Sequence, residues 1–127
     1  MTNPKQRDAE TRVPLHLVPP VFMIGVAAVL REGASQEGRW PYNWRDNPVT
    51  LTTYISAAMR HLLALASGED IDPKSGRPHE EHLGANAAII SDARACGTLI
   101  DDRHKVEDGA AELMRTLNRE WTNEIRG

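Results

Sequence analysis

The sequence has few of the residues that build disulfide-stapled or sheet-rich proteins. Its 127 residues include a single cysteine, Cys96, which cannot form an internal disulfide, so a disulfide-stapled secreted scaffold is excluded. Aromatic residues are also scarce, with one Phe, two Tyr and three Trp making up 5% of the chain. Because sandwiches and barrels draw on aromatic and β-branched residues for their strands, this composition weighs against an all-β fold.

An excess of basic charge and a long apolar run are absent as well. The 15 Lys and Arg stand against 18 Asp and Glu, a formal net charge of -3, whereas a general nucleic-acid binder carries a basic stripe. The longest apolar run, residues 21–30, is about half of what a bilayer-spanning helix needs. The polar N-terminus has no apolar signal-peptide core. We therefore expect a soluble, intracellular protein with neither a nucleic-acid nor a membrane partner.

The spacing of the apolar residues, together with the prolines and glycines, favours an all-α fold of four helices in a single domain over residues 1–127. Residues 1–12 are polar and are expected to be frayed. Pro20 suits the first turn of a helix that ends near residues 33–38. That helix is apolar on most faces, so we expect it to be buried, either centrally or at a subunit interface. The periodicity predicts three further helices, over residues 50–68, 79–96 and 106–125.

A loop over residues 38–48 holds half of the aromatic residues. Trp40, Tyr42 and Trp44 alternate there with polar residues such as Asn43. Aromatic rings with nearby polar groups predict either a surface that stacks on a nucleotide base or a plug over the core.

Imidazoles recur at helical spacing on both sides of a second loop. His61 and Glu69 are eight residues apart, a little over two turns, and so share a helix face. His79, His82 and Asn86 follow the spacing i, i+3 and i+7 and share a face of the next helix. A short turn after the first of these helices predicts that the two are antiparallel neighbours.

This pairing predicts which polar groups meet. Counting residues from the loop places His61 level with Asn86, while four further groups gather nearer the loop: Glu69, Asp72, His79 and His82. Carboxylates and imidazoles in one place can hold a divalent cation. The alternative interpretation is that the carboxylates are solvated loop residues and that His79 only caps the following helix.

Several motifs in this order resemble a known family. They are Leu15-His16-Leu17-Val18-Pro19-Pro20, Tyr42-Asn43-Trp44-Arg45, Arg60-His61-Leu62-Leu63-Ala64, and the run from Gly68 to His79 followed by His82 and Asn86. Together they resemble the phage dATP/dGTP diphosphohydrolases, which are related to the MazG-like all-α nucleotide pyrophosphohydrolases. The resemblance covers roughly residues 13–95, and residues 68–86 are its most specific part.

The resemblance implies a concrete function. It implies cleavage of a deoxynucleoside triphosphate, above all dGTP, to the monophosphate and pyrophosphate, with dGMP supplying synthesis of a phage 2-aminoadenine nucleotide. It implies Mg²⁺ or Mn²⁺ held on two adjacent helices, where the ions neutralise phosphate charge and activate water. It also implies a four-helix bundle of MazG-like type that works as a homodimer or homotetramer with sites at subunit contacts. The setting would be the cytoplasm of an infected bacterium.

The resemblance and the polar cluster together give each residue an expected role. The expected catalytic residues are Glu69, Asp72 and His61. The candidate metal ligands are Glu69 and Asp72, joined by Glu32, Glu37, His79, His82 and Asn86. The expected phosphate contacts are Arg60, Lys74 and Arg77. The expected contacts with a purine base are Trp40, Tyr42, Asn43 and Trp44.

The chain departs from the MazG-like pattern in one respect. It has neither Glu-Glu-x-x-Glu nor Glu-x-x-Asp at the expected helical positions. Either the ligand set is rearranged, or Glu32 and Glu37 contribute to it, or the chain binds a nucleotide without cleaving it. A non-catalytic nucleotide-binding or sequestering phage protein is therefore the alternative function, and a helical assembly module with solvated polar loops is a third.

Overall fold

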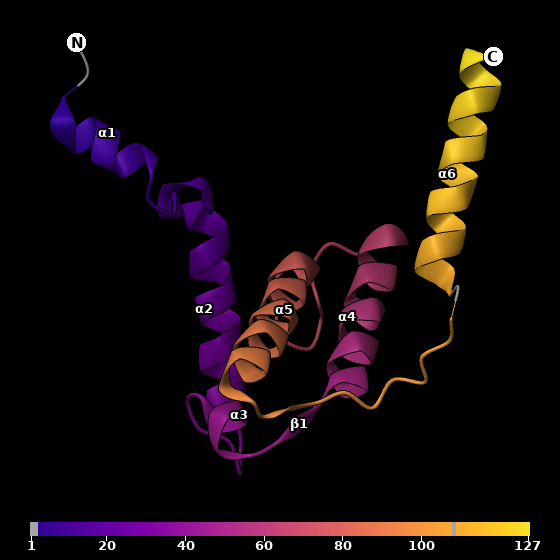
Figure 1. Cartoon of the computed structure of the whole chain (residues 1–127). Helices are drawn as coiled ribbons and strands as arrows, with labels where there is room; N and C mark the ends of the chain where they lie inside the picture. Colours follow the sequence, from indigo (N-terminus) through magenta and orange to yellow (C-terminus); the bar gives the residue numbers. More distant parts are fainter. Residues whose placement is uncertain (1–2, 108) are drawn as a thin grey trace.

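The computed structural model describes residues 3–107 and 109–127 and is built mainly of helices (Figure 1). In chain order the elements are α1 (Pro4–Glu10), the 3-10 helix η1 (Leu15–Leu17), α2 (Pro20–Ala34), α3 (Asn43–Asp46), β1 (Val49–Thr50), α4 (Leu51–Ala66), α5 (His79–Cys96), β2 (Leu99–Ile100) and α6 (Ala110–Arg126). The all-α prediction is confirmed, and α2, α4, α5 and α6 are the four expected helices. No helix in these two ranges is long and apolar enough to cross a membrane.

Helix α5 is the centre of the packed part of the chain. Helix α4 packs along it in the antiparallel direction, as expected, and α2 packs on it as well (Figure 1). The buried apolar residues at these contacts are Leu51 on α4 and Ala85 and Ala93 on α5. Gly97 follows the last turn of α5 with a positive φ of 76°, a backbone conformation that ends helices and favours glycine.

Two glycines allow α2 and α5 to approach each other closely. A Cβ atom placed on Gly84 would collide with the ring of Phe22 and would lie 2.6 Å from Val26 Cγ2. A Cβ atom on Gly25 would collide with the side chain of Glu81. Hydrogen atoms in place of side chains therefore set the spacing of these two helices.

Two short strands connect the end of α5 to the start of α4. Strands β1 and β2 form a parallel pair, with Val49 opposite Leu99 and Thr50 opposite Ile100. The sequence predicted no strand, because two residues are too few to show a period of two. The pair ties the chain that leaves α5 to the start of α4.

The N-terminus differs from its prediction. Residues 1 and 2 lie outside the described part, but Pro4–Glu10 form helix α1 where a frayed segment was expected. Asn3 caps this helix by accepting a hydrogen bond from the backbone N–H of Lys5 at 2.8 Å, and Pro4 occupies the first turn. No residue of α1 is buried, so the helix depends on local capping alone.

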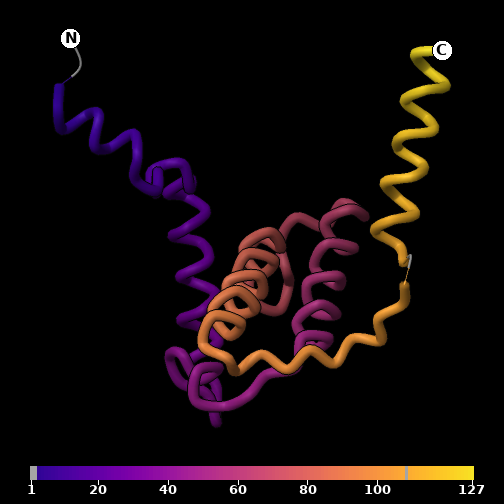
Figure 2. The backbone as a smooth tube through the Cα atoms, in the orientation of Figure 1, coloured from indigo at the N-terminus to yellow at the C-terminus, as the bar shows by residue number. Residues whose placement is uncertain are grey.

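Much apolar surface stays exposed in the single chain. Burial of the first helix at the centre of the chain is wrong, since Gly25 is the one buried residue of α2 and Ile24 is 68% exposed. Its burial at a subunit interface stays a prediction. Leu62, part of the apolar stripe of α4, is 54% exposed. Helix α6 stands apart from the packed helices with Trp121 and Ile125 exposed, so three of the four predicted helices pack together (Figures 1 and 2).

Candidate metal centre

The connection between α4 and α5 folds back on itself instead of forming a plain turn. The backbone N–H of Asp72 donates to the carbonyl of Arg77 at 3.0 Å, and that of Gly76 donates to the carbonyl of Asp72 at 2.8 Å. Ile71 and Pro78 face each other in an isolated antiparallel bridge. Gly76 has φ at 71°, which a side chain would disfavour at this tight turn. These bonds return the loop carboxylates to the first turn of α5.

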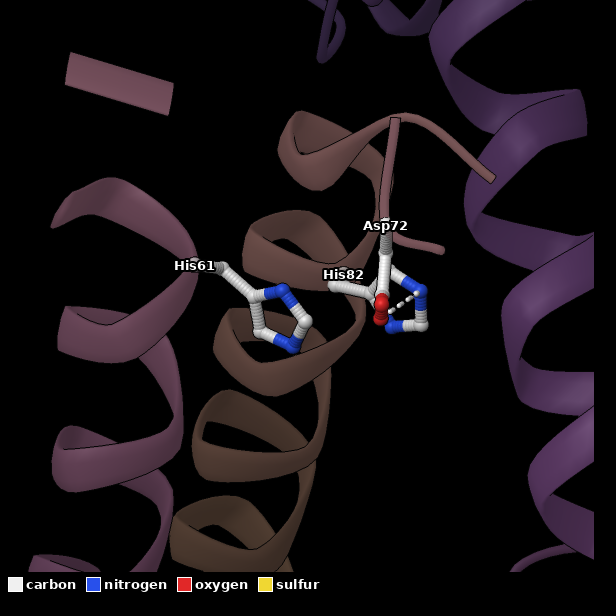
Figure 3. Close-up of side chains that lie close together, drawn as sticks. All are labelled: His61, Asp72 and His82. Carbon is white, nitrogen blue, oxygen red and sulfur yellow. Dashed lines mark ion pairs between the residues drawn. The ribbon is translucent and has the colours of Figure 1, made fainter. Parts of the chain in front are cut away.

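Three side chains from three elements converge beside this loop (Figure 3). His61 comes from α4, Asp72 from the loop and His82 from α5, and one donor atom from each lies within 4.8 Å of the others. The rings of His61 and His82 stack with their centroids 4.3 Å apart and their planes 2° from parallel. His82 Nε2 lies 3.5 Å from Asp72 Oδ2. All three side chains are partly buried.

A second imidazole pair extends the cluster. His79, which is 4% exposed, shares a hydrogen bond between its Nδ1 and Nδ1 of His61 at 2.9 Å. Its other nitrogen, Nε2, lies 2.8 Å from Oε1 of Glu69. A carboxylate on one ring nitrogen sets the orientation and tautomer of a histidine. Glu69, His79 and His61 therefore form a connected chain that ends at the three converging groups.

The surroundings of the cluster favour the protonation states in which His61 and Asp72 can bind a cation. Burial lowers the pKa of His61, the nearby His82 lowers it further, and Asp72 acts in the opposite direction. The backbone N–H of Lys74 lowers the pKa of Asp72, and the surrounding imidazoles act in the same direction. At neutral pH Asp72 is therefore ionised while His61 has a lone pair for a metal ion.

Five of the predicted catalytic and metal residues thus come together: His61, Glu69, Asp72, His79 and His82. The predicted register is wrong by about one turn, because His61 meets His82 rather than Asn86, which lies four residues or about 6 Å further along α5. The folded loop causes this difference, since it lets α5 start beside His61 rather than level with the end of α4.

Besides Asn86, two further predicted ligands do not join the cluster within one chain. Glu81, in the first turn of α5, meets α2 at Gly25. Glu32 lies seven residues further along α2, a rise of about 10 Å away from that contact. Glu37 follows the end of α2, and both glutamates are exposed. Within one chain, Glu32 and Glu37 therefore do not contribute to this cluster.

The predicted phosphate contacts have different surroundings. Arg77 donates through Nε at 2.7 Å to Oε1 of Glu81, which is 8% exposed. Arg60 is exposed and donates from Nη1 to Ser56 Oγ at 3.0 Å. Lys74 is exposed on the folded loop. The sequence did not predict the partnership of Arg77 with Glu81, because Arg77 precedes α5 and the i, i+4 rule applies within a helix.

Ser75 is a further residue that sequence reasoning missed. Its hydroxyl oxygen lies 2.6 Å from Nε2 of His82, and it also accepts a hydrogen bond from the backbone N–H of Arg77 at 3.2 Å. A serine in a polar loop has no pattern that marks such a role, because only the folded turn brings it to the histidine.

The aromatic loop lies at the other end of α5. Trp44 donates from Nε1 to Asp92 Oδ2 at 2.6 Å, and Arg45 binds both oxygens of the same carboxylate. These donors lower the pKa of Asp92 to about 2. Asp92 is ten residues from His82, about 15 Å along the helix. Trp44 thus anchors α3 on α5.

The other predicted base contacts are near this anchor and not near the cluster of the same chain. Trp40 is 43% exposed and donates from Nε1 to Asp46 Oδ2 at 2.8 Å, while Tyr42 is 54% exposed. Asn43 begins α3 and is partly buried. Trp40 and Tyr42 are therefore exposed, with the guanidinium of Arg45 over the Tyr42 ring at 4.2 Å from its centroid, whereas Trp44 is engaged with α5.

Comparisons with known proteins support the resemblance found in the motifs. A family model described as "dATP/dGTP diphosphohydrolase, N-terminal" matches residues 2–103. A protein of Salmonella phage PMBT28 named "dATP/dGTP diphosphohydrolase" is 32% identical over 79 residues, which make up 62% of this chain and 26% of that relative.

The chain spans about a quarter of the length of this curated relative. No solved structure matches it. The matched range of the family model contains the whole imidazole and carboxylate cluster and ends before α6. Since this model covers most of the chain, the protein belongs to the family of dATP/dGTP diphosphohydrolase N-terminal domains.

Proposed function

We propose that this chain carries the hydrolytic site of a deoxynucleoside triphosphate diphosphohydrolase, with dGTP as the preferred substrate. The observation that carries the proposal is the convergence of His61, Asp72 and His82 within the residues that match a family named for this reaction. Because the relative belongs to a Salmonella phage, we place the reaction in the cytoplasm of an infected bacterium. The product dGMP would supply synthesis of a 2-aminoadenine nucleotide.

The reaction breaks one phosphoanhydride bond. The oxygen of water bonds to the α-phosphorus, the bond to the oxygen bridging the α- and β-phosphates breaks, and pyrophosphate leaves with that oxygen. Asp72, His61 and His82 would hold the divalent cation, for which the resemblance implies Mg²⁺ or Mn²⁺. When bound, such an ion neutralises phosphate charge and lowers the pKa of water.

The neighbouring groups have positioning and phosphate-binding roles in this proposal. His79 lies in hydrogen-bond contact with His61 through Nδ1 and with Glu69 through Nε2, so the Glu69 carboxylate orients His79, which in turn orients the imidazole of His61. Lys74 and Arg60, both exposed, would contact the phosphates, whereas Arg77 stays paired with Glu81. Glu69 thus acts through His79 rather than as a direct metal ligand.

We also propose that the protein works as a homodimer or homotetramer. The support is the apolar surface that one chain leaves exposed on α2 and α4, including Val21, Ile24, Met59, Leu62 and Leu63. A second copy would bury this surface and would let an aromatic loop with Trp40 and Tyr42 approach the metal centre of its neighbour. Light scattering after size-exclusion chromatography should give two or four chain masses, and Leu62→Glu should lower that number. A wild-type monomer at assay concentration would contradict the proposal.

The substrate prediction is tested by direct turnover. The purified protein is incubated with dGTP, dATP, dCTP or dTTP and with Mg²⁺ or Mn²⁺, and phosphorus NMR identifies the products. We expect dGMP and pyrophosphate from dGTP, a slower reaction with dATP, and no reaction in the presence of a chelator. A folded protein that leaves dGTP intact would refute the enzyme. If dGTP then still raised its melting temperature, the alternative of a nucleotide-binding protein would hold.

A further inference from the structure

The donor set at the cluster disagrees with the acidic set that the family resemblance implies. Mg²⁺ is a hard ion that takes oxygen ligands in near-octahedral geometry. The three converging groups here offer two imidazoles, His61 and His82, and one carboxylate, Asp72. Imidazole suits iron, cobalt, nickel, copper and zinc, whereas carboxylate and water suit Mg²⁺. The residues present therefore fit a transition-metal ion better than Mg²⁺.

We infer that His61, Asp72 and His82 form a two-histidine, one-carboxylate centre that selects a transition-metal ion such as Fe²⁺, Co²⁺ or Zn²⁺ over Mg²⁺. Its part in catalysis rests on the proposed function, but ion selection can be measured without turnover. Three protein ligands leave further coordination positions open, as catalytic metal sites require. A triphosphate oxygen and a water can occupy such positions.

The partner of His61 matches the arrangement found around metal ligands. A ligand histidine normally has its second nitrogen held by another polar group, which fixes the tautomer. His61 uses Nδ1 toward His79, and His82 uses Nε2 toward the Ser75 hydroxyl. Among the described residues no hydrogen bond involves the remaining nitrogen of either ring. His61 therefore has Nε2 left for an ion, whereas Nε2 of His82 faces both the Ser75 hydroxyl and, at 3.5 Å, Asp72, so an ion that binds His82 beside Asp72 must displace that hydroxyl.

The stacking of the His61 and His82 rings predicts a spectroscopic change when an ion binds. Rings that are parallel at 4.3 Å do not direct both in-plane lone pairs at one point. An ion bound by both histidines must turn at least one ring and separate the stack. Because stacked rings shift the proton resonances of each other, Zn²⁺ should move the ring-proton signals of His61 and His82 far more than those of His16 and His104.

Ion selection is tested on the full chain by titration with Co²⁺, followed through its visible absorption. We expect a bound-cobalt spectrum that Zn²⁺ removes and that a large excess of Mg²⁺ leaves in place. Absence of a bound-cobalt spectrum, or displacement of Co²⁺ by Mg²⁺ at comparable concentration, would overturn the inference. Because this comparison uses the wild-type chain, it does not depend on the folding of any variant.

Variants then locate the site. His61→Ala and His82→Ala should each weaken Co²⁺ binding by more than about 100-fold, since even outer partners of a metal ligand contribute 10- to 100-fold. The matched controls are His16→Ala and His104→Ala, which remove exposed imidazoles and should bind as the wild type does. Equal losses in all four variants would overturn the assignment. Circular dichroism checks that each variant keeps its helices.

The outcomes separate this inference from the proposed function. Selective Co²⁺ binding without dGTP hydrolysis under any metal supports the centre and refutes the enzyme. Hydrolysis of dGTP with Mg²⁺ and no selective Co²⁺ binding supports the enzyme and overturns the centre.

Discussion

Replacing Asp72 with asparagine should lower the rate of dGTP hydrolysis by at least about 100-fold. The substitution keeps the shape of the side chain but removes the one carboxylate among the three converging groups. Two imidazoles without a negative charge hold a divalent cation less well. The loss should appear in kcat when the assay is saturated with dGTP and metal. Circular dichroism should show an unchanged helix content, since Asp72 lies in the loop and not in a helix.

Asp70→Asn is the matched control for this variant. Asp70 lies two residues away, is exposed, and loses the same charge on substitution. Its backbone carbonyl accepts a hydrogen bond from the N–H of His79 at 3.0 Å, and the substitution leaves that carbonyl in place. We expect the wild-type rate. If both variants lost activity equally, the effect would come from the net charge of the loop, and the metal assignment of Asp72 would be wrong.

Replacing Gly84 with valine should destabilise the protein by about 1–3 kcal/mol, the usual effect of extra methyl groups in a packed contact. The added atoms would collide with Phe22 and Val26 on α2, and the rigid backbones of two helices limit how far these side chains can retreat. Helix α2 must then move away from α5. Urea unfolding followed by circular dichroism measures the change in the free energy of unfolding.

Gly33→Ala provides the control for that measurement. Gly33 lies in the last turns of α2, and a Cβ atom placed on it meets nothing within 4 Å. Alanine is the better helix former by up to about 1 kcal/mol, so this variant should equal or exceed the wild type in stability. A Gly84→Val variant as stable as Gly33→Ala would show that the spacing of α2 and α5 does not depend on the glycine.

The sequence alone predicted the features that depend on neighbours along the chain. Pro20 predicted the start of α2, and Gly68 and Gly97 predicted the ends of α4 and α5, because these residues act on their own backbone. The periodicity placed His79 and His82 on one face of α5, and the short connection predicted that α4 is its antiparallel neighbour. These inferences succeeded because helix formation and capping are local.

Only the tertiary structure decided which of these faces meet, and at what height. The hydrogen bonds of the loop around Asp72 bring His61 to His82 instead of Asn86, and they bring Ser75 into the cluster. The helical period predicts on which face of a helix a side chain lies, but it does not predict which residue of a neighbouring helix lies opposite it. The pairing of His61 with His82 depends on the folded loop and therefore could not be predicted from the period.

The same reason explains the positions of the aromatic loop and of α6. Trp44 is held by Asp92, a contact across 48 residues that no local pattern marks. The apolar residues of α6 lie on one face of the helix, which predicts that this face packs against another surface. Amphipathic spacing does not identify that surface, and no residue of α6 is buried in this chain. Local interactions thus determined the helices and the faces on which the imidazoles lie. Long-range contacts determined which imidazoles and carboxylates come together in one cluster.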